Sequence, residues 1–137
     1  MKVVLEEGAI LPKRAHEADA GFDLYAREDG HIFPNARAVF DTGVHIAIPE
    51  GYEGHIRSRS SMMVKKGCIT DGTIDSGYTG SIGVILFNLS GKLVEIKKGE
   101  KIAQIVIEPI FAPDLEVVEQ LEATERGDGG FGSTGKF

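Results

Sequence analysis

Short apolar runs, each closed by turn residues, recur along most of the chain. Residues 44–48 and 94–96 alternate apolar side chains with others before Pro-Glu-Gly and Lys-Lys-Gly turns. Residues 82–87 form a continuous apolar run suited to a strand buried on both faces, and residues 102–107 form another. A last short run begins at 115–117. Strands this short, separated by Gly, Pro, Asn and Asp, predict an all-β fold, a jelly-roll or β-clip-like barrel.

One stretch, residues 60–67, predicts a short helix of one or two turns. A serine can cap its start, two lysines suit its negative end and Gly67 can end it. The preceding Arg-Ser-Arg at 57–59 brings guanidinium and hydroxyl groups to the free N–H groups of a helix start, which suits a phosphate. A capped surface turn with incidental arginines explains the same residues equally well.

Residues 72–80 combine glycines at both ends and in the middle with a single acid, Asp75. Ser76 and Gly77 read as the tip of a tight hairpin. A rigidly held, partly desolvated carboxylate with no Lys or Arg in the stretch suits a general base. The alternative is an Asp that only stabilises the turn, through a hydrogen bond between its side chain and the backbone, which is a common role for Asp.

The last residues, 126–137, are too rich in glycine to build a core and predict a flexible arm beyond a barrel domain at 1–125. Residues 130–136 fit the phosphate-loop spacing, but Phe137 stands where Ser or Thr is required. An arm that orders over an anionic ligand accounts for the basic, hydroxyl and aromatic residues among the glycines. A disordered tail is the alternative.

Composition narrows the remaining functions. A chain of 137 residues is most simply one domain, and its net charge of −6 argues against a general nucleic-acid binder. One cysteine, Cys68, rules out an intrachain disulfide and favours a reducing compartment. There is no apolar run long enough for a membrane span, no close histidine pairing of a zinc site and no G-x-S-x-G elbow. We expect a cytoplasmic protein, or one inside the host cell if the chain is viral.

Taken together, these stretches resemble the five motifs of the trimeric deoxyuridine triphosphatase (dUTPase) family. In chain order they are 20–24, 59–61, 72–80, 99–104 and 126–135. The third and fifth are highly specific. The resemblance implies a jelly-roll homotrimer in which neighbouring subunits build each of three active sites and another subunit's C-terminal arm closes it. The implied reaction is hydrolysis of dUTP to dUMP and pyrophosphate, which keeps uracil out of DNA and supplies dUMP for thymidylate synthesis.

The resemblance also implies a role for each site residue. Asp75 activates the water that attacks the α-phosphorus, and Mg²⁺ binds through the substrate triphosphate and water, with no direct protein ligand. Asp23 supports the site or the water shell of the metal. The implied phosphate-binding residues are Arg59, Ser60, Ser61 and Gln104. The implied nucleoside-binding residues are Gly72, Thr73, Ile74, Gly83 and Tyr78. The implied arm residues are Arg126, Phe131, Gly132, Ser133 and Thr134, with Phe131 stacking on uracil.

Two positions depart from the family pattern. Ser58 stands where proline usually precedes the second-motif arginine, and Ile69 stands where some members place an asparagine. Two alternatives share the scaffold: a deoxycytidine triphosphate deaminase and a viral-type regulatory binding protein.

Overall fold

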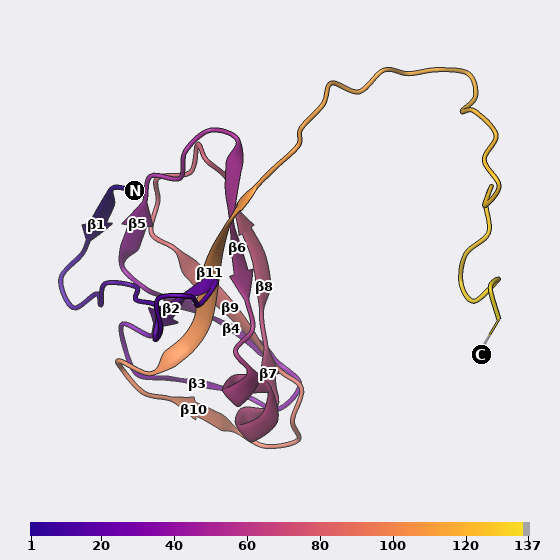
Figure 1. Ribbon diagram of the computed structural model, residues 1–137. Helices are drawn as coiled ribbons and strands as arrows, with labels where there is room; N and C mark the ends of the chain where they lie inside the picture. Colours follow the sequence, from indigo (N-terminus) through magenta and orange to yellow (C-terminus); the bar gives the residue numbers. More distant parts are fainter. Residues whose placement is uncertain (136–137) are drawn as a thin grey trace.

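The computed structural model describes residues 1–135, which consist almost entirely of short strands followed by an extended tail (Figure 1). The strands are β1 (Val3–Leu5), β2 (Gly21–Tyr25), β3 (Gly30–Ile32), β4 (Arg37–Asp41), β5 (Val44–Ile46), β6 (Tyr52–Arg57), β7 (Cys68–Ile69), β8 (Asp71–Ile74), β9 (Gly83–Asn88), β10 (Val94–Ile96) and β11 (Lys101–Pro109). The one helix within residues 1–135 is η1 (Met62–Lys66), a short π-type turn. Over the same residues, no helix is long and apolar enough to cross a membrane.

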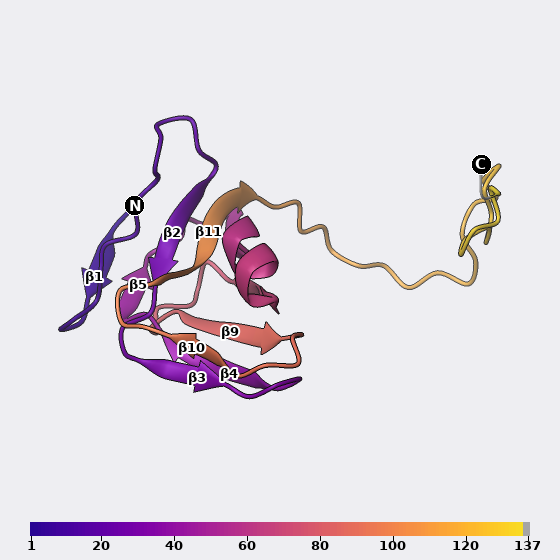
Figure 2. The same cartoon turned by 90° about the horizontal axis from the view of Figure 1, so that it is seen from below.

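The strands form a jelly-roll-type barrel, as predicted. Two larger sheets, β2-β11-β6-β8 and β4-β9-β7, are joined by the pairs β1-β5 and β3-β10, and every pairing is antiparallel. The larger sheets contribute side chains to one shared core. Figure 2 shows β2 and β11 on one side of the molecule and β4 and β9 on the other. Among the fully buried residues, Leu24 and Ile105 come from one sheet, and Val84 and Leu86 from the other.

Strand β9 corrects one prediction, because its buried positions alternate. Val84 and Leu86 are fully buried, whereas Ile85 and Phe87 are each 39% exposed. Only one face of the β4-β9-β7 sheet is covered by the rest of this chain, so the apolar run at 82–87 is not buried on both faces. Its outward side chains leave an apolar surface on the barrel.

Strand β11 confirms the predicted run at 102–107 and explains its lack of alternation. The register with β2 shifts between Lys101 and Ala103, where a β-bulge lets the successive residues Ile102 and Ala103 both point inward. Ile105 and Val106 are also buried. The bulge thereby turns a nine-residue strand around the core.

Two further expectations are wrong in detail. No strand begins at 115–117, where Leu115 and Val117 are almost fully exposed in a tail that offers them no partner strand within residues 1–135. The helix at 60–67 forms, but the Ser61 side chain makes no capping hydrogen bond; the backbone of Ser61 is already helical. Gly67 does end the helix, in the left-handed conformation predicted for a C-cap glycine, with φ of 66°.

Cys68 is fully buried as a free thiol, and burial raises its pKa. His45 lies within β5, and both of its ring nitrogens have hydrogen-bond partners.

Candidate functional site

A polar cleft lies at one end of the β2-β11-β6-β8 sheet and brings together several predicted site residues. In the strand register Gln104 stands opposite both Asp23 on β2 and Arg57 on β6, and the chain leaving β6 passes the same edge. Asp23, Arg59, Ser60 and Gln104 therefore line a common cleft of about 290 Å³. The predicted first, second and fourth motifs meet there.

Gly21 makes room for this arrangement. A Cβ atom on Gly21 would lie 2.4 Å from Gln104 Oε1, closer than side-chain atoms approach, and 3.1 Å from Gln104 Cβ, a tight contact. Gln104 in turn donates a hydrogen bond from Nε2 to the carbonyl oxygen of Ser58 over 3.3 Å. The glycine of the first motif thus sets the position of an amide in the fourth.

Asp23 holds the basic groups of the cleft in place. Its carboxylate lies 3.1 Å from Arg59 Nε and 2.7 Å from Lys101 Nζ, and the residue is only 8% exposed. The hydrogen bond and the charge of Asp23 raise the pKa of Lys101. Arg59 Nη1 also donates to the carbonyl oxygen of Lys101 over 3.2 Å. Two of the three guanidinium nitrogens of Arg59, Nε and Nη1, are therefore held by the barrel.

Ser58, a departure from the family pattern, has a defined role that the sequence did not indicate. Its hydroxyl donates to the carbonyl oxygen of Thr70 and accepts the N–H of Thr70, both over 2.8 Å. This pair of bonds ties the loop that carries Arg59 to the connection between β7 and β8. A proline could make neither bond.

The third motif forms a turn at the far end of β8. The N–H of Tyr78 donates to the carbonyl oxygen of Asp75 over 2.9 Å and closes the turn around Ser76 and Gly77. The predicted turn is confirmed, but its arms do not form a hairpin: β8 pairs with β6, whereas β9 pairs with β4 and β7. The Asp75 carboxylate is exposed in this chain, so the expected partial desolvation does not come from its own subunit.

The other predicted nucleoside-binding residues lie on either side of this turn. Tyr78 folds back over Gly80, where a Cβ atom would lie 2.4 Å from the tyrosine hydroxyl, and that hydroxyl donates to the carbonyl oxygen of Ser81 over 2.9 Å. Gly72, Thr73 and Ile74 belong to β8, and Gly83 begins β9.

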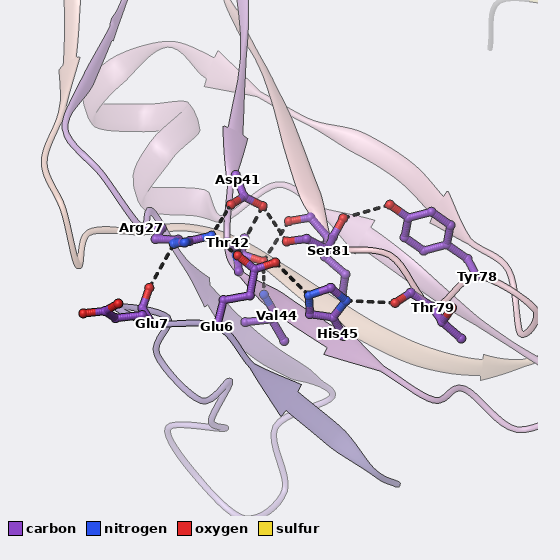
Figure 3. Close-up of polar contacts among 12 residues, drawn as sticks. Glu6, Glu7, Arg27, Asp41, Thr42, Val44, His45, Tyr78, Thr79 and Ser81 are labelled. Atoms are coloured by element: carbon purple, nitrogen blue, oxygen red, sulfur yellow. Dashed lines mark hydrogen bonds and ion pairs between the residues drawn. The ribbon is translucent and has the colours of Figure 1, made fainter.

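A hydrogen-bonded network behind the turn fixes residues 79–81 to the barrel (Figure 3). His45 Nδ1 lies 2.8 Å from the carbonyl oxygen of Thr79, and His45 Nε2 lies 2.9 Å from Glu6 Oε1. The Ser81 hydroxyl donates to Asp41, whose other carboxylate oxygen accepts from Arg27 over 2.8 Å. Sequence reasoning missed this network because its members come from four distant segments.

The protonation of His45 follows from its partners. A carbonyl oxygen and a carboxylate can only accept, so both ring nitrogens must donate and the imidazole is a cation when the network is intact. The hydrogen bond to Thr79, followed by that to Glu6, raises the pKa of His45. The hydrogen bonds to His45 and then to Arg27 lower the pKa of Glu6.

The arm residues lie away from the barrel of their own chain. After Pro109 the chain runs outward to residue 135 (Figure 1). Phe131 is fully exposed, and Arg126 Nε donates to the nearby carbonyl oxygen of Gly129 over 2.9 Å. Gly132, Ser133 and Thr134 follow in short local turns. Within one chain, these arm residues lie near neither the polar cleft nor the Asp75 turn.

The cleft and the Asp75 turn are also separate within one chain. Arg57 pairs with Asp71 and Gly54 with Ile74, so Asp75 follows at the level of Glu53. Glu53 and Arg57 are four residues apart along β6, a distance of about 13 Å. Arg59 lies further along the chain, beyond the end of β6. The predicted base and the predicted phosphate-binding arginine therefore occupy opposite ends of the same sheet.

Comparison with known proteins gives consistent matches over nearly the whole chain. A family model described as dUTPase matches residues 7–135. The deoxyuridine 5'-triphosphate nucleotidohydrolase of Clostridium tetani is 48% identical over 136 residues, covering 97% of this chain and 94% of that protein. The Mus musculus protein of the same name is 45% identical over 135 residues, covering 98% and 83%.

Solved structures agree with the sequence matches. A dUTPase of Staphylococcus bacteriophage 80alpha, solved with dUpNHpp, superposes with a TM-score of 0.92 at 34% identity, covering 98% of both chains. A dUTPase from phage phi11 of S. aureus, described with a structural Mg(II) ion, gives a TM-score of 0.82 at 33% identity over 89% of this chain and 98% of that one.

Proposed function

This chain belongs to the dUTPase family, and from that premise we propose that it hydrolyses dUTP to dUMP and pyrophosphate. The observation that carries the proposal is the family-model match over residues 7–135, which includes every predicted site residue. The 48% identity to a named nucleotidohydrolase supports it. The arrangement of the chain's own polar groups agrees with the chemistry that this reaction needs.

Asp75 is the proposed general base. It accepts a proton from the water that attacks the α-phosphorus, and the turn closed by Tyr78 N–H holds it in place. Its exposure in one chain leaves it accessible to a substrate bound by another subunit. The surrounding subunit and the closed arm then supply the desolvation that a base near neutral pH requires.

The proposed triphosphate site is the cleft of Arg59, Ser60 and Gln104, with Ser61 beside it. Within residues 1–135 the helix does not use the Ser61 hydroxyl as a side-chain cap, which leaves this hydroxyl to a ligand. Asp23 acts as a positioning residue for Arg59. The guanidinium then meets phosphate oxygens already aligned, which lowers the entropy cost of binding.

The uracil and deoxyribose contacts come from the Asp75 turn and its flanks. Backbone groups of 72–74 and Gly83 read the base edge, and Tyr78 lies under the sugar, where a 2′-hydroxyl would be crowded. Phe131 stacks on the base as Arg126, Ser133 and Thr134 close on the γ-phosphate, with Gly132 giving the arm its bend at φ of 93°.

The residues of the cleft fit a magnesium ion that the substrate carries. The Asp23 carboxylate is shared between Arg59 and Lys101, and Asp19, the other acid that lines the cleft, accepts the N–H of His16. Within residues 1–135 the cleft therefore offers no cluster of unpaired carboxylates. Mg²⁺ retains waters and binds substrate phosphates in such sites, where it neutralises the charge that develops on the leaving pyrophosphate.

A homotrimer with shared active sites explains two features of the single chain. The first is the separation of Asp75 from Arg59 along the sheet, because a site that needs both must combine two copies. The second is the outward apolar face of the β4-β9-β7 sheet, formed by Val39, Ile69, Ile85 and Phe87, of which Val39 is 68% exposed. Burial of such a face against another subunit is favourable.

The test is a nucleotide panel of dUTP, dCTP, dTTP and UTP, assayed for pyrophosphate and for ammonia with and without Mg²⁺. We expect Mg²⁺-dependent pyrophosphate release from dUTP alone. Ammonia release from dCTP would replace the proposal with the deaminase alternative, and no turnover of any nucleotide would favour the regulatory binding alternative. Sedimentation equilibrium tests the trimer separately, because a monomeric, active enzyme would contradict shared sites.

A further inference from the structure

Two glutamates and a histidine gather on the outer face of the β2-β11-β6-β8 sheet, away from the phosphate cleft. Glu53 and His55 lie two residues apart on β6, and Glu108 lies on the neighbouring β11. One ligand atom from each of the three lies within 4.8 Å of the other two, and all three residues are partly buried. The proposed reaction does not use this group.

The strand register makes this group unfavourable without a cation. Glu108 stands directly opposite Glu53, and like charges in directly opposed strand positions destabilise a sheet. Arg57 offsets part of the repulsion through an ion pair with Glu108 Oε1. Within residues 1–135, Glu53 forms no ion pair, and the second oxygen of Glu108 lies 3.7 Å from His55 Nδ1.

The hydrogen bond on the other side of His55 prepares the ring for a metal. His55 Nε2 lies 2.7 Å from Asp71 Oδ1 on β8, and a carboxylate can only accept, so Nε2 carries the proton. In the neutral ring the lone pair is then on Nδ1, the atom that faces Glu108. A histidine that binds metal through one nitrogen commonly donates the other N–H to a carboxylate, which fixes the ring and strengthens the ligand.

Among residues 1–135, Arg57 competes for this lone pair. Its Nε lies 3.3 Å from His55 Nδ1, which is consistent with an unprotonated acceptor at that position. The Arg57 side chain is 44% exposed. It can therefore turn into solvent when a cation takes its place between His55 and the two carboxylates.

We propose that Glu53, His55 and Glu108 bind a divalent transition-metal ion such as Zn²⁺, with Asp71 orienting His55. One imidazole nitrogen and two carboxylate oxygens are ligands that Zn²⁺ accepts, and three protein ligands leave a position for water. The imidazole favours Zn²⁺ over Mg²⁺, which prefers oxygen ligands alone. None of the three ligands is among the residues assigned to the proposed hydrolysis, and the metal is not the one that the nucleotide carries.

The experiment is a titration of the nucleotide-free, full-length protein with Zn²⁺, followed by calorimetry and by the melting temperature. We expect one ion per chain for the wild type and loss of that binding in His55→Ala and Glu108→Gln. Asp71→Asn retains all three ligands but loses the orienting carboxylate, so we expect about 10–100-fold weaker binding. The matched control is His16→Ala, which removes an exposed loop histidine and should bind Zn²⁺ like the wild type.

Circular dichroism establishes that each variant is folded, and Asp71→Asn and Glu108→Gln carry the test if His55→Ala does not fold. A parallel titration with Mg²⁺ should give much weaker binding at this site. Zn²⁺ affinity that is unchanged in folded His55→Ala or Glu108→Gln, or the absence of Zn²⁺ binding by the wild type at millimolar concentration, would overturn the proposal.

Discussion

Two buried threonines allow a sharp test of what a buried hydroxyl group contributes to the stability of the barrel. Thr42 is 1% exposed; its hydroxyl donates to the carbonyl oxygen of Ile82 over 2.7 Å and accepts the N–H of Val44 over 3.2 Å. Thr70 is 6% exposed, and its hydroxyl oxygen has no hydrogen-bond partner within residues 1–135. Replacement of either residue by valine keeps the shape and removes only the hydroxyl.

The magnitudes follow from these contacts. Thr42→Val loses one buried hydrogen bond, at about 0.5–1.5 kcal/mol, and leaves the Val44 N–H without an acceptor, at about 1–3 kcal/mol. We therefore expect a loss of roughly 2–4 kcal/mol in the free energy of unfolding, or a fall of about 6–15 °C in melting temperature. Thr70→Val removes a hydroxyl that is already unpaired, so its stability should be unchanged or raised by up to about 1 kcal/mol.

The assay is thermal and urea unfolding of both variants at one fixed protein concentration, because association of subunits makes the melting temperature depend on concentration. A loss of stability in Thr70→Val as large as that in Thr42→Val would refute the reasoning. So would a Thr42→Val protein that melts within a degree of the wild type.

Three further predictions concern the site. Because the pKa of His45 is raised, the stability that His45 contributes is complete below the ordinary pKa of histidine and is lost as pH rises through the raised pKa. Because the pKa of Glu6 is lowered, the stability that Glu6 contributes is lost only when pH falls below the ordinary pKa of glutamate. Melting temperature measured from pH 5.5 to 8.5 should therefore fall more steeply in the wild type than in His45→Gln, and parallel curves would contradict the network. Asp23→Asn should raise the KM for dUTP by at least about tenfold, because the guanidinium of Arg59 loses its carboxylate partner. The control is Asp114→Asn, which changes an exposed residue and should leave the KM unchanged. Steady-state kinetics of both variants measures the difference. Truncation after Glu125 should leave the melting temperature unchanged and lower kcat/KM by about 100-fold, and unchanged turnover would remove the arm from the reaction.

The sequence predicted the strands where local periodicity matches local burial. Residues 44–48 and 94–96 alternate and form half-buried strands, and Gly67 ends the helix as a C-cap glycine should. The burial of residues 82–87 was predicted wrongly, because composition cannot distinguish a face covered by the same chain from one left for another subunit. Residues 115–117 carry a strand-like pattern but have no partner strand within the described part of the chain, residues 1–135.

The site was predicted by motif and not by contact. The sequence places Asp75 in a turn and Arg59 beside a helix start, but it does not show that the strand register separates them along one sheet. Polar groups that support the site, such as Ser58 and the network of Glu6 with His45, depend on contacts between distant segments. Residue spacing along the chain carries no signal for these contacts.

The central claim is that the Asp75 carboxylate activates water, and the turnover of Asp75→Asn tests it most directly. Asp75 is exposed, and its side chain forms no hydrogen bond or ion pair within residues 1–135. The free energy of unfolding of the variant should therefore lie within about 0.5 kcal/mol of the wild-type value. Pyrophosphate release from dUTP should nevertheless fall by about 100-fold to 10,000-fold, because a positioned general base is lost. A folded Asp75→Asn enzyme that releases pyrophosphate at the wild-type rate would contradict the account.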